Sequence, residues 1–283
     1  MGKKSSKLKL KDWLIYGGIG MGVGLGTVWG LTDGIGLYYK HKNGLELLDT
    51  NVHLKEGVHD VVITNQFYKL LKYEDLQTEN KNLQAIKDSE ETIIEGMKKA
   101  YEDLNEVNKG IQFNLCAETD ELASYGIQKK DNIDKKNDLL LYLTADEIKS
   151  SNGKLTLAEA STNWDIFTRE LKNESITFRR DYMSVRWGVF EEIQNKEEPD
   201  FRKSYSYILT LHETMHAMGF AHQKNEDSIM CASITSTSPR ALTQKDIVMI
   251  QRYNEVFYNS KYETPHLNNM TTNENELAFK FEK

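Results

Sequence analysis

Three histidines and one glutamate lie close together between positions 212 and 222. His212 and His216 are four residues apart, so on a helix their rings project from one face and can bind the same metal ion. With His222 as a third imidazole, a tetrahedral zinc ion keeps one position open for water. An open position is typical of catalytic zinc, so these histidines are predicted to bind one catalytic Zn2+ ion.

Glu213 directly follows the first of these histidines. Zinc lowers the pKa of a bound water to about 7, so a neighbouring carboxylate can remove its proton at neutral pH. The predicted reaction is therefore hydrolysis by a metal-bound water that Glu213 activates.

Gly219 separates the helical histidine pair from the third histidine. A glycine there can adopt a positive φ, after which the chain can turn back and bring His222 to the metal. A histidine pair alone arises often by chance, but only seven histidines occur in the chain and three fall at these offsets. A set of ordinary core histidines is therefore disfavoured against a metal site.

The segments around this site alternate between helix and strand patterns. The apolar residues of the histidine segment recur at helical spacing, which predicts a buried helix. A long amphipathic helix is predicted from Asp88 to Asn108, with Gly110 as its C-cap. Strands are predicted at 61–64, 111–116 and 139–143, with one or two more within 176–187. Strands before and after a long helix indicate a helix-and-sheet sandwich.

The two ends of the chain differ in composition from its centre. Residues 1–12 contain five lysines, whereas residues 13–32 contain no charged side chain. Twenty uncharged residues on a helix rise about 30 Å, the thickness of a hydrocarbon core, and the lysine bias predicts a cytoplasmic N-terminus. A linker is predicted at 33–57, an extracytoplasmic catalytic domain at 58–258, and a polar tail at 259–283.

Three interpretations stay open for residues 13–32. A retained transmembrane anchor is favoured, because no alanine occurs before Ala85 to form the cleavage site of a signal peptide. A cleaved signal peptide would instead release a secreted protein. The segment is also rich in glycine, which contributes little hydrophobicity, so a segment that never inserts into a membrane is the third interpretation.

Charge and cysteine content limit the other classes of function. The net charge of −7 provides no basic face, so a nucleic-acid partner is not expected.

The chain contains two cysteines, Cys116 and Cys231, which match no metal-binding cysteine spacing. They are predicted either to pair outside the cytosol or to be two free thiols.

On the residues HExxHxxGxxH, from His212 to His222, the chain resembles the metzincin zinc peptidases and, within them, the matrixins. Met230 lies eight residues after His222, at the spacing of the matrixin methionine turn. Leu242 to Tyr253 is similar to the C-terminal matrixin helix, with leucine, aspartate and isoleucine-glutamine in matching places. The resemblance is strong from about Ser206 to Tyr253.

This resemblance implies a twisted five-stranded sheet, mostly parallel, with an antiparallel edge strand above the cleft. A peptide substrate would add to that edge as another strand. It further implies that Glu213 passes its proton to the leaving amine, and that Met230 is a hydrophobic floor beneath the zinc rather than a ligand. The chain departs from the family in lacking the propeptide cysteine switch, evident calcium loops, and any histidine between His59 and His212, so a single zinc ion is predicted.

The predicted function is that of a zinc endopeptidase that cleaves proteins or peptides outside the cytosol. An alternative from another class is a non-catalytic, zinc-stabilised binding domain tethered to a membrane. Glu213 argues against this alternative, because a structural site needs no carboxylate beside an open ligand position. A processing enzyme for one partner in the same envelope is a third possibility.

Overall fold

The computed structural model describes residues 52–77, 83–149, 155–165, 170–183, 201–223, 227–232 and 238–258. These residues all belong to one compact unit, which spans Leu45–Lys283. The predicted basic N-terminus (1–12), the predicted anchor (13–32), most of the predicted linker and the predicted tail (259–283) lie outside the described residues. Among the helices that are described, none combines the length and hydropathy needed to cross a bilayer.

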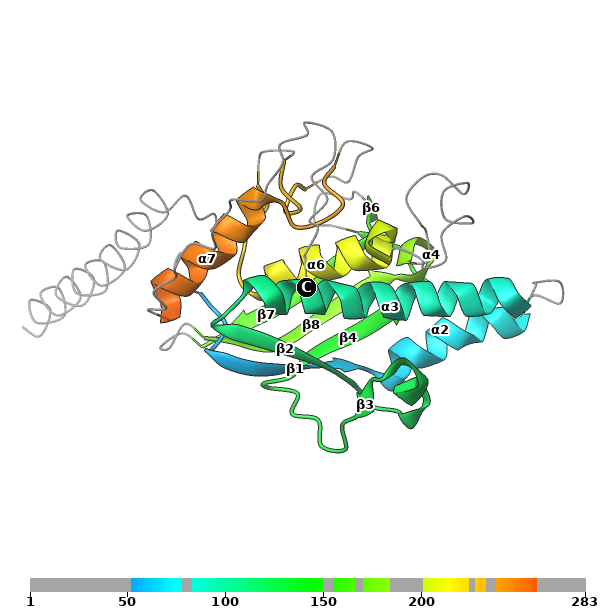
Figure 1. Cartoon of the computed structure of the whole chain (residues 1–283). Coiled ribbons are helices and arrows are strands. Elements are labelled where there is room, and N and C mark those ends of the chain that lie inside the picture. Colours follow the sequence, from blue (N-terminus) through cyan, green and yellow to red (C-terminus); the bar gives the residue numbers. More distant parts are fainter. Residues whose placement is uncertain are drawn as a thin grey trace, which may run out of the picture. The chain divides into compact units, whose positions relative to one another are not determined.

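A six-stranded sheet forms the centre of this unit (Figure 1). Its strand order is β3–β2–β1–β4–β8–β7, and every neighbouring pair is parallel except β7 and β8. The strands are β1 (Gly57–Ile63), β2 (Ile111–Ala117), β3 (Gln128–Lys129), β4 (Leu139–Thr144), β7 (Ala158–Trp164) and β8 (Leu171–Arg179). A separate two-stranded ribbon contains β5 (Ile148–Lys149) and β6 (Leu155–Thr156).

The predicted mixed fold, with a mostly parallel sheet and an antiparallel edge strand, is confirmed. The observed sheet has six strands rather than the five expected. The additional strand is the short β3, which pairs with the end of β2 over two residues. A segment this short shows no alternation of apolar and polar residues, so its sequence carries no strand signal.

The principal helices cover one face of the sheet (Figure 1). Alternate residues of the strands, such as Val61 and Ile63 in β1, point into the core on that face, whereas Val62 faces the other way. The helical elements are α2 (Asn65–Gln77), α3 (Leu83–Val107), α4 (Arg180–Met183), α6 (Tyr205–Ala217) and α7 (Gln244–Tyr258), with 3-10 turns η1 (Asp120–Tyr125) and η2 (Phe201–Lys203). Helix α3 packs on α6, and its predicted apolar face is buried from Ile93 to Leu104.

The ends of α3 differ from the sequence prediction. The helix starts at Leu83, five residues ahead of the expected cap at Asp88, and stops at Val107. Gly110 is not among the described glycines with positive φ, so it is not a left-handed C-cap. A Cβ atom on Gly110 would lie 2.2 Å from Cδ2 of Tyr258, so this glycine instead permits close packing of the turn after α3 against α7.

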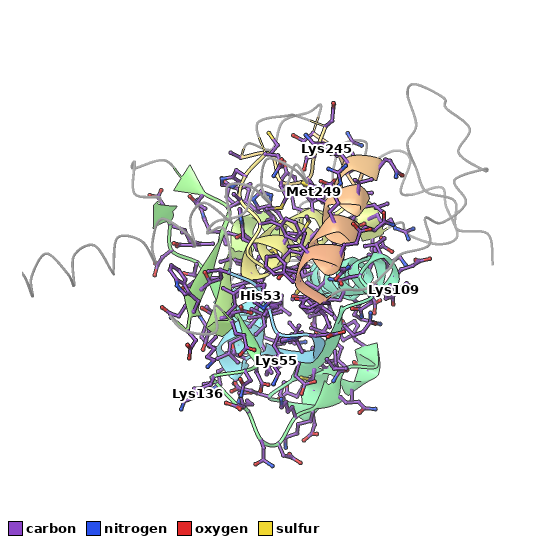
Figure 2. The ribbon with its side chains drawn as sticks, turned by 90° about the vertical axis from the view of Figure 1, so that its left-hand side faces the viewer. His53, Lys55, Lys109, Lys136, Lys245 and Met249 are labelled. Carbon is purple, nitrogen blue, oxygen red and sulfur yellow. The ribbon has the colours of Figure 1, made fainter. Side chains whose placement is uncertain are left out.

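The segment ahead of β1 is part of the packed unit. Val52 and Leu54 are buried, and the carbonyl of His53 accepts a hydrogen bond from the N–H of Leu171 at 2.9 Å. The ring of His53 stacks on Phe257 of α7, with ring centroids 4.6 Å apart. Figure 2 labels His53. Residues 52–54, which lie within the predicted linker (33–57), are therefore packed into the described unit.

Candidate metal centre and active site

Helix α6 is a buried helix that contains His212 and His216. Its N-cap is Ser204, whose hydroxyl accepts a hydrogen bond from the N–H of Tyr207 at 3.2 Å. Every residue from Ser206 to Ala217 is buried, so packing on several sides fixes the helix axis and rotation. A helix held this firmly positions both of its histidines with little freedom.

Gly219 ends the helical segment with a φ of +100°, as its position in the motif predicts. Its N–H donates to the carbonyl of His216 at 2.8 Å. A Cβ atom here would also lie 2.9 Å from the carbonyl oxygen of Val52. Two independent constraints, a left-handed backbone and a close neighbouring chain, therefore require glycine at this turn.

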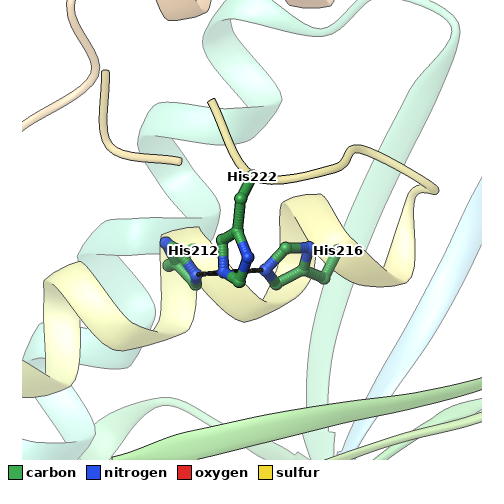
Figure 3. A group of neighbouring side chains, drawn as sticks. All are labelled: His212, His216 and His222. Carbon is green, nitrogen blue, oxygen red and sulfur yellow. Dashed lines mark hydrogen bonds between the residues drawn. The ribbon is translucent and has the colours of Figure 1, made fainter. Parts of the chain in front are cut away.

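The three histidines of the motif meet at one point (Figure 3). The Nε2 atoms of His212 and His216 are 3.1 Å apart, those of His216 and His222 are 3.1 Å apart, and those of His212 and His222 are 3.2 Å apart. Nitrogen ligands about 2.0–2.1 Å from a tetrahedral zinc ion lie about 3.3 Å from one another. Within the described residues, this is the one cluster of at least three such side chains that could hold a metal ion.

The remaining ring nitrogens show which atoms are free to bind a cation. Nδ1 of His212 donates to the carbonyl of Ile229 and Nδ1 of His216 donates to the carbonyl of Phe220, both at 2.7 Å. Since a carbonyl only accepts, each Nδ1 carries the proton and each Nε2 of the neutral rings has a lone pair. Lone pairs at 3.1 Å repel each other unless a cation lies between them, so these residues fit a bound zinc ion.

Burial keeps these ligands in the form that binds metal. Burial lowers the pKa of His212 to about 4 and, together with the neighbouring His212 ring, lowers the pKa of His216 to about 3. The pKa of His222, which is partly exposed, is also lowered by burial. All three rings are therefore neutral at neutral pH, as a zinc ligand must be.

Glu213 lies beside this cluster and is only 5% exposed. Burial raises the pKa of Glu213 to about 8, although a hydrogen bond from the backbone of Ala160 in β7 opposes the shift. The backbone contact brings the carboxyl group to the edge strand of the sheet. The positive charge of a zinc ion bound to the neighbouring histidines would lower this pKa and favour the ionised carboxylate, which is the form that takes up a proton.

The predicted methionine lies in a tight turn next to His222. Met230 is fully buried, and its carbonyl accepts a hydrogen bond from the N–H of Gln223 at 2.8 Å. The turn is closed by a hydrogen bond of 3.1 Å from the N–H of Cys231 to the carbonyl of Ser228. Ile229, in the middle of this turn, supplies the carbonyl that orients His212.

Asp246 supports this turn, a role that its match to the C-terminal helix of the family did not predict. Its buried carboxylate accepts hydrogen bonds from the hydroxyl of Ser228 and, at 3.2 Å, from the N–H of Ile229. It also accepts from the N–H of Thr243 at 2.9 Å, while the Thr243 hydroxyl accepts from the N–H of Asp246 at 3.2 Å. This reciprocal pair is a capping box at the start of α7, and the spacing T-x-x-D was the signal that could have identified it.

The two cysteines are free thiols on separate parts of the fold. Cys116 is buried in β2 on the face of the sheet away from the helices, and Cys231 belongs to the turn beside His222. The alternative of a disulfide between them is therefore wrong. Burial raises the pKa of the Cys116 thiol to about 12, so this thiol is protonated and inert at neutral pH.

Comparisons with known proteins bear on the family of this chain. Among solved structures, the chain is similar to archaemetzincin from Methanopyrus kandleri, with 10% sequence identity, a TM-score of 0.38, and coverage of 70% of this chain and 96% of that chain. No curated protein sequence matches. The Matrixin family model matches residues 68–254, which is more than half of the 283 residues. The match includes the whole histidine motif and the turn that follows it, and the protein therefore belongs to the matrixin family of zinc metallopeptidases.

Proposed function

We propose that this protein is an endopeptidase in which His212, His216 and His222 bind one catalytic zinc ion and Glu213 is the general base. The observation that carries the proposal is the convergence of three Nε2 atoms within 3.2 Å of each other, beside a buried carboxyl group. When bound, zinc supplies a Lewis acid that polarises a carbonyl group and makes water more acidic.

The protein's own groups supply the proton transfers and the position of the substrate. Glu213 takes a proton from the attacking water and delivers it to the nitrogen of the departing amine. The backbone hydrogen bond from Ala160 holds the Glu213 carboxyl group at the edge of β7. Met230 fills the space beneath the histidines with apolar surface and makes no bond to the ion.

An extended peptide binds along β7 in this proposal. Among the described strands β7 pairs only with β8, so its other edge has backbone groups available for a further strand. Adding a strand to such an edge is a common way to bind peptides, because the backbone bonds do not depend on the substrate sequence. This arrangement supports cleavage within a chain rather than at its end.

Glu213→Ala separates this proposal from a non-catalytic zinc-binding domain. We expect wild-type protein to contain about one zinc ion per chain and to cleave a mixed peptide library, with activity lost on chelation. The variant should keep its zinc, because the three histidines remain, and lose at least about 100-fold in kcat/KM. Equal cleavage by the two forms, or no cleavage by the wild type, would count against the proposal.

A location outside the cytosol is part of the proposal and rests on the sequence. Five lysines precede the uncharged residues 13–32, which supports an N-terminus in the cytoplasm and a catalytic domain across the membrane. Mass spectrometry of the mature N-terminus distinguishes a retained anchor from a cleaved signal peptide. Protease treatment of intact cells then tests the side of the membrane, since a cytoplasmic domain would be protected.

A further inference from the structure

Trp164 is a large apolar side chain that the protein leaves open to solvent. It is 44% exposed, and among the described residues the other large exposed apolar side chain is Val58 in β1. Trp164 is the last residue of β7, the edge strand that Glu213 contacts. An exposed tryptophan on this edge strand is available to contact a peptide that binds along the edge.

The pairing of β7 with β8 shows on which face this side chain lies. Trp164 is opposite Leu171 after a register shift between Ser161 and Asn163, and paired residues project from the same face of a sheet. Leu171 is only 6% exposed, and its Cδ1 atom is 3.7 Å from the position of a Cβ atom on Gly219. Trp164 therefore projects from the face that carries α6.

Alternation along β7 leads to the same face. Ala158 belongs to the buried core and Ala160 packs against it, and residues an even number of positions further along a strand share that side. Trp164 is four residues beyond Ala160, so along the strand it is about 13 Å from the point where Glu213 meets β7. The side chain thus lies on the same face and the same edge as the reacting groups, one short stretch of extended peptide away.

The direction of an added strand fixes which part of a substrate reaches this residue. Antiparallel pairing is the more stable arrangement per residue and continues the antiparallel pairing of β7 with β8. A substrate that runs antiparallel to β7 passes Trp164 before it reaches Ala160. Its residues N-terminal to the cleaved bond then lie over the indole ring.

We infer that Trp164 forms a distal apolar subsite that selects a large apolar or aromatic side chain about four residues N-terminal to the cleaved bond. This inference rests on the proposed function. The indole ring provides a flat apolar surface of low conformational entropy for such a side chain. Backbone pairing along β7 would then give general affinity, and Trp164 would give preference at one position.

The test uses peptides that share one cleaved bond and carry phenylalanine or alanine at the third, fourth or fifth residue before it. For wild-type protein, we expect kcat/KM to be about tenfold higher for phenylalanine at one of these positions, since an apolar contact commonly discriminates by this factor. Trp164→Ala should reduce this ratio to about 1, and Trp164→Phe should keep most of it. Val58→Ala removes the other exposed apolar side chain and should leave the ratio unchanged.

A binding measurement makes the result independent of turnover. Fluorescence anisotropy gives the Kd of the labelled phenylalanine and alanine peptides on zinc-loaded Glu213→Ala and on Glu213→Ala with Trp164→Ala. We expect a preference in the first protein and none in the second, with matching circular dichroism spectra. A preference that survives Trp164→Ala, or that maps C-terminal to the cleaved bond, would overturn the inference. Absence of cleavage of every peptide by wild-type protein would instead overturn the proposed function.

Discussion

Asp246 of α7 is linked to His212 of α6 through a single residue, Ile229. The N–H of Ile229 donates to the Asp246 carboxylate at 3.2 Å, and the carbonyl of Ile229 accepts from Nδ1 of His212 at 2.7 Å. The C-terminal helix therefore fixes the tautomer and orientation of a proposed zinc ligand through the turn that contains Met230. Groups that orient a ligand in this way commonly affect metal affinity as well as stability.

Asp246→Asn should weaken zinc binding in a protein that still folds. An amide keeps one acceptor oxygen but replaces the other with an NH2 group, which cannot accept a hydrogen bond. One carboxylate oxygen of Asp246 accepts from the N–H groups of Ile229 and Thr243, and the other accepts from the hydroxyl of Ser228, so in either orientation of the amide at least one of these donors loses its acceptor. We expect zinc affinity to fall by about tenfold, measured by competition with a chromophoric chelator. Asp120→Asn, which changes an exposed carboxylate, is the matched control. Unchanged affinity in a folded Asp246→Asn protein would show that the turn does not depend on this carboxylate.

Gly219→Ala should be more damaging than the same change at another left-handed glycine. Gly126 has a φ of +75° and open space where a Cβ atom would lie, whereas Gly219 has a φ of +100° and a carbonyl oxygen 2.9 Å from that position. We expect Gly126→Ala to cost about 1 kcal/mol in free energy of unfolding, from backbone strain alone. Gly219→Ala should cost at least about 2 kcal/mol and also weaken zinc binding, because it displaces the turn that presents His222. Urea unfolding measures both losses of stability, and equal losses would argue against the close approach of Val52.

Removal of the metal should lower thermal stability. If zinc is present at about 100 times its Kd, its binding to the folded state alone contributes about 2.7 kcal/mol. For a domain of roughly 150–250 residues, this corresponds to a fall in Tm of about 5–10 °C after chelation. Differential scanning calorimetry before and after chelator treatment measures the shift. The shift should persist in Glu213→Ala and disappear in His216→Ala, so a chelator effect in the latter would point to a different metal site.

Acid should destabilise the contact between α3 and α6 through Asp103. Burial alone would raise the pKa of Asp103, but hydrogen bonds from Arg202 and Tyr207 outweigh it and hold the pKa below its usual value. A carboxylate with a lowered folded-state pKa adds stability above its unfolded pKa of about 3.9, and this contribution is lost as the pH falls through the folded-state value.

Urea unfolding between pH 7 and pH 3 tests this contribution. Wild-type protein should lose more stability over this range than Asp103→Asn, because the variant has no carboxylate to protonate at that position. Parallel pH profiles for the two proteins would show that the Asp103 contacts do not contribute to acid sensitivity. Asp134→Asn provides a comparison with Asp103→Asn, because hydrogen bonds from Lys136 and Asn137 lower the pKa of the Asp134 carboxylate, but this carboxylate is exposed and its contacts lie within its own loop.

The sequence predicted that the three histidines converge, but it did not predict the contacts that hold the surrounding elements in place. His212, Glu213, His216, Gly219 and His222 lie within one short segment, so helical geometry and one glycine turn are enough to bring the three rings together. Asp246 acts across a turn from another helix, and the spacing that marks it as a capping residue does not show what its carboxylate will contact. Such long-range hydrogen bonds depend on how elements pack, which local patterns do not specify.

The same limit applies to Gly110 and to the burial of residues 52–54. A glycine after a helical pattern predicts a cap, yet Gly110 is required by the close approach of Asn254 and Tyr258 of α7, which lie far away in the chain. Residues 52–54 lie within the range predicted as a linker, yet they are held by Tyr253 of α7, whose hydroxyl accepts a hydrogen bond from the N–H of Leu54 at 2.9 Å. In each case the deciding contact comes from a residue that is distant in sequence.

The packing of residues 52–54 against the rest of the protein has a practical consequence for any truncated form of this enzyme. In a fragment that starts at residue 58, the hydroxyl of Tyr258 would lose its acceptor, the carbonyl of Leu54, and the N–H of Leu171 would lose the carbonyl of His53. The loss of Val52 would also leave a void beside Gly219. Weak activity in such a fragment would then reflect damage to the turn that presents His222, rather than a poor catalyst. Recombinant versions of the catalytic domain should begin ahead of Val52.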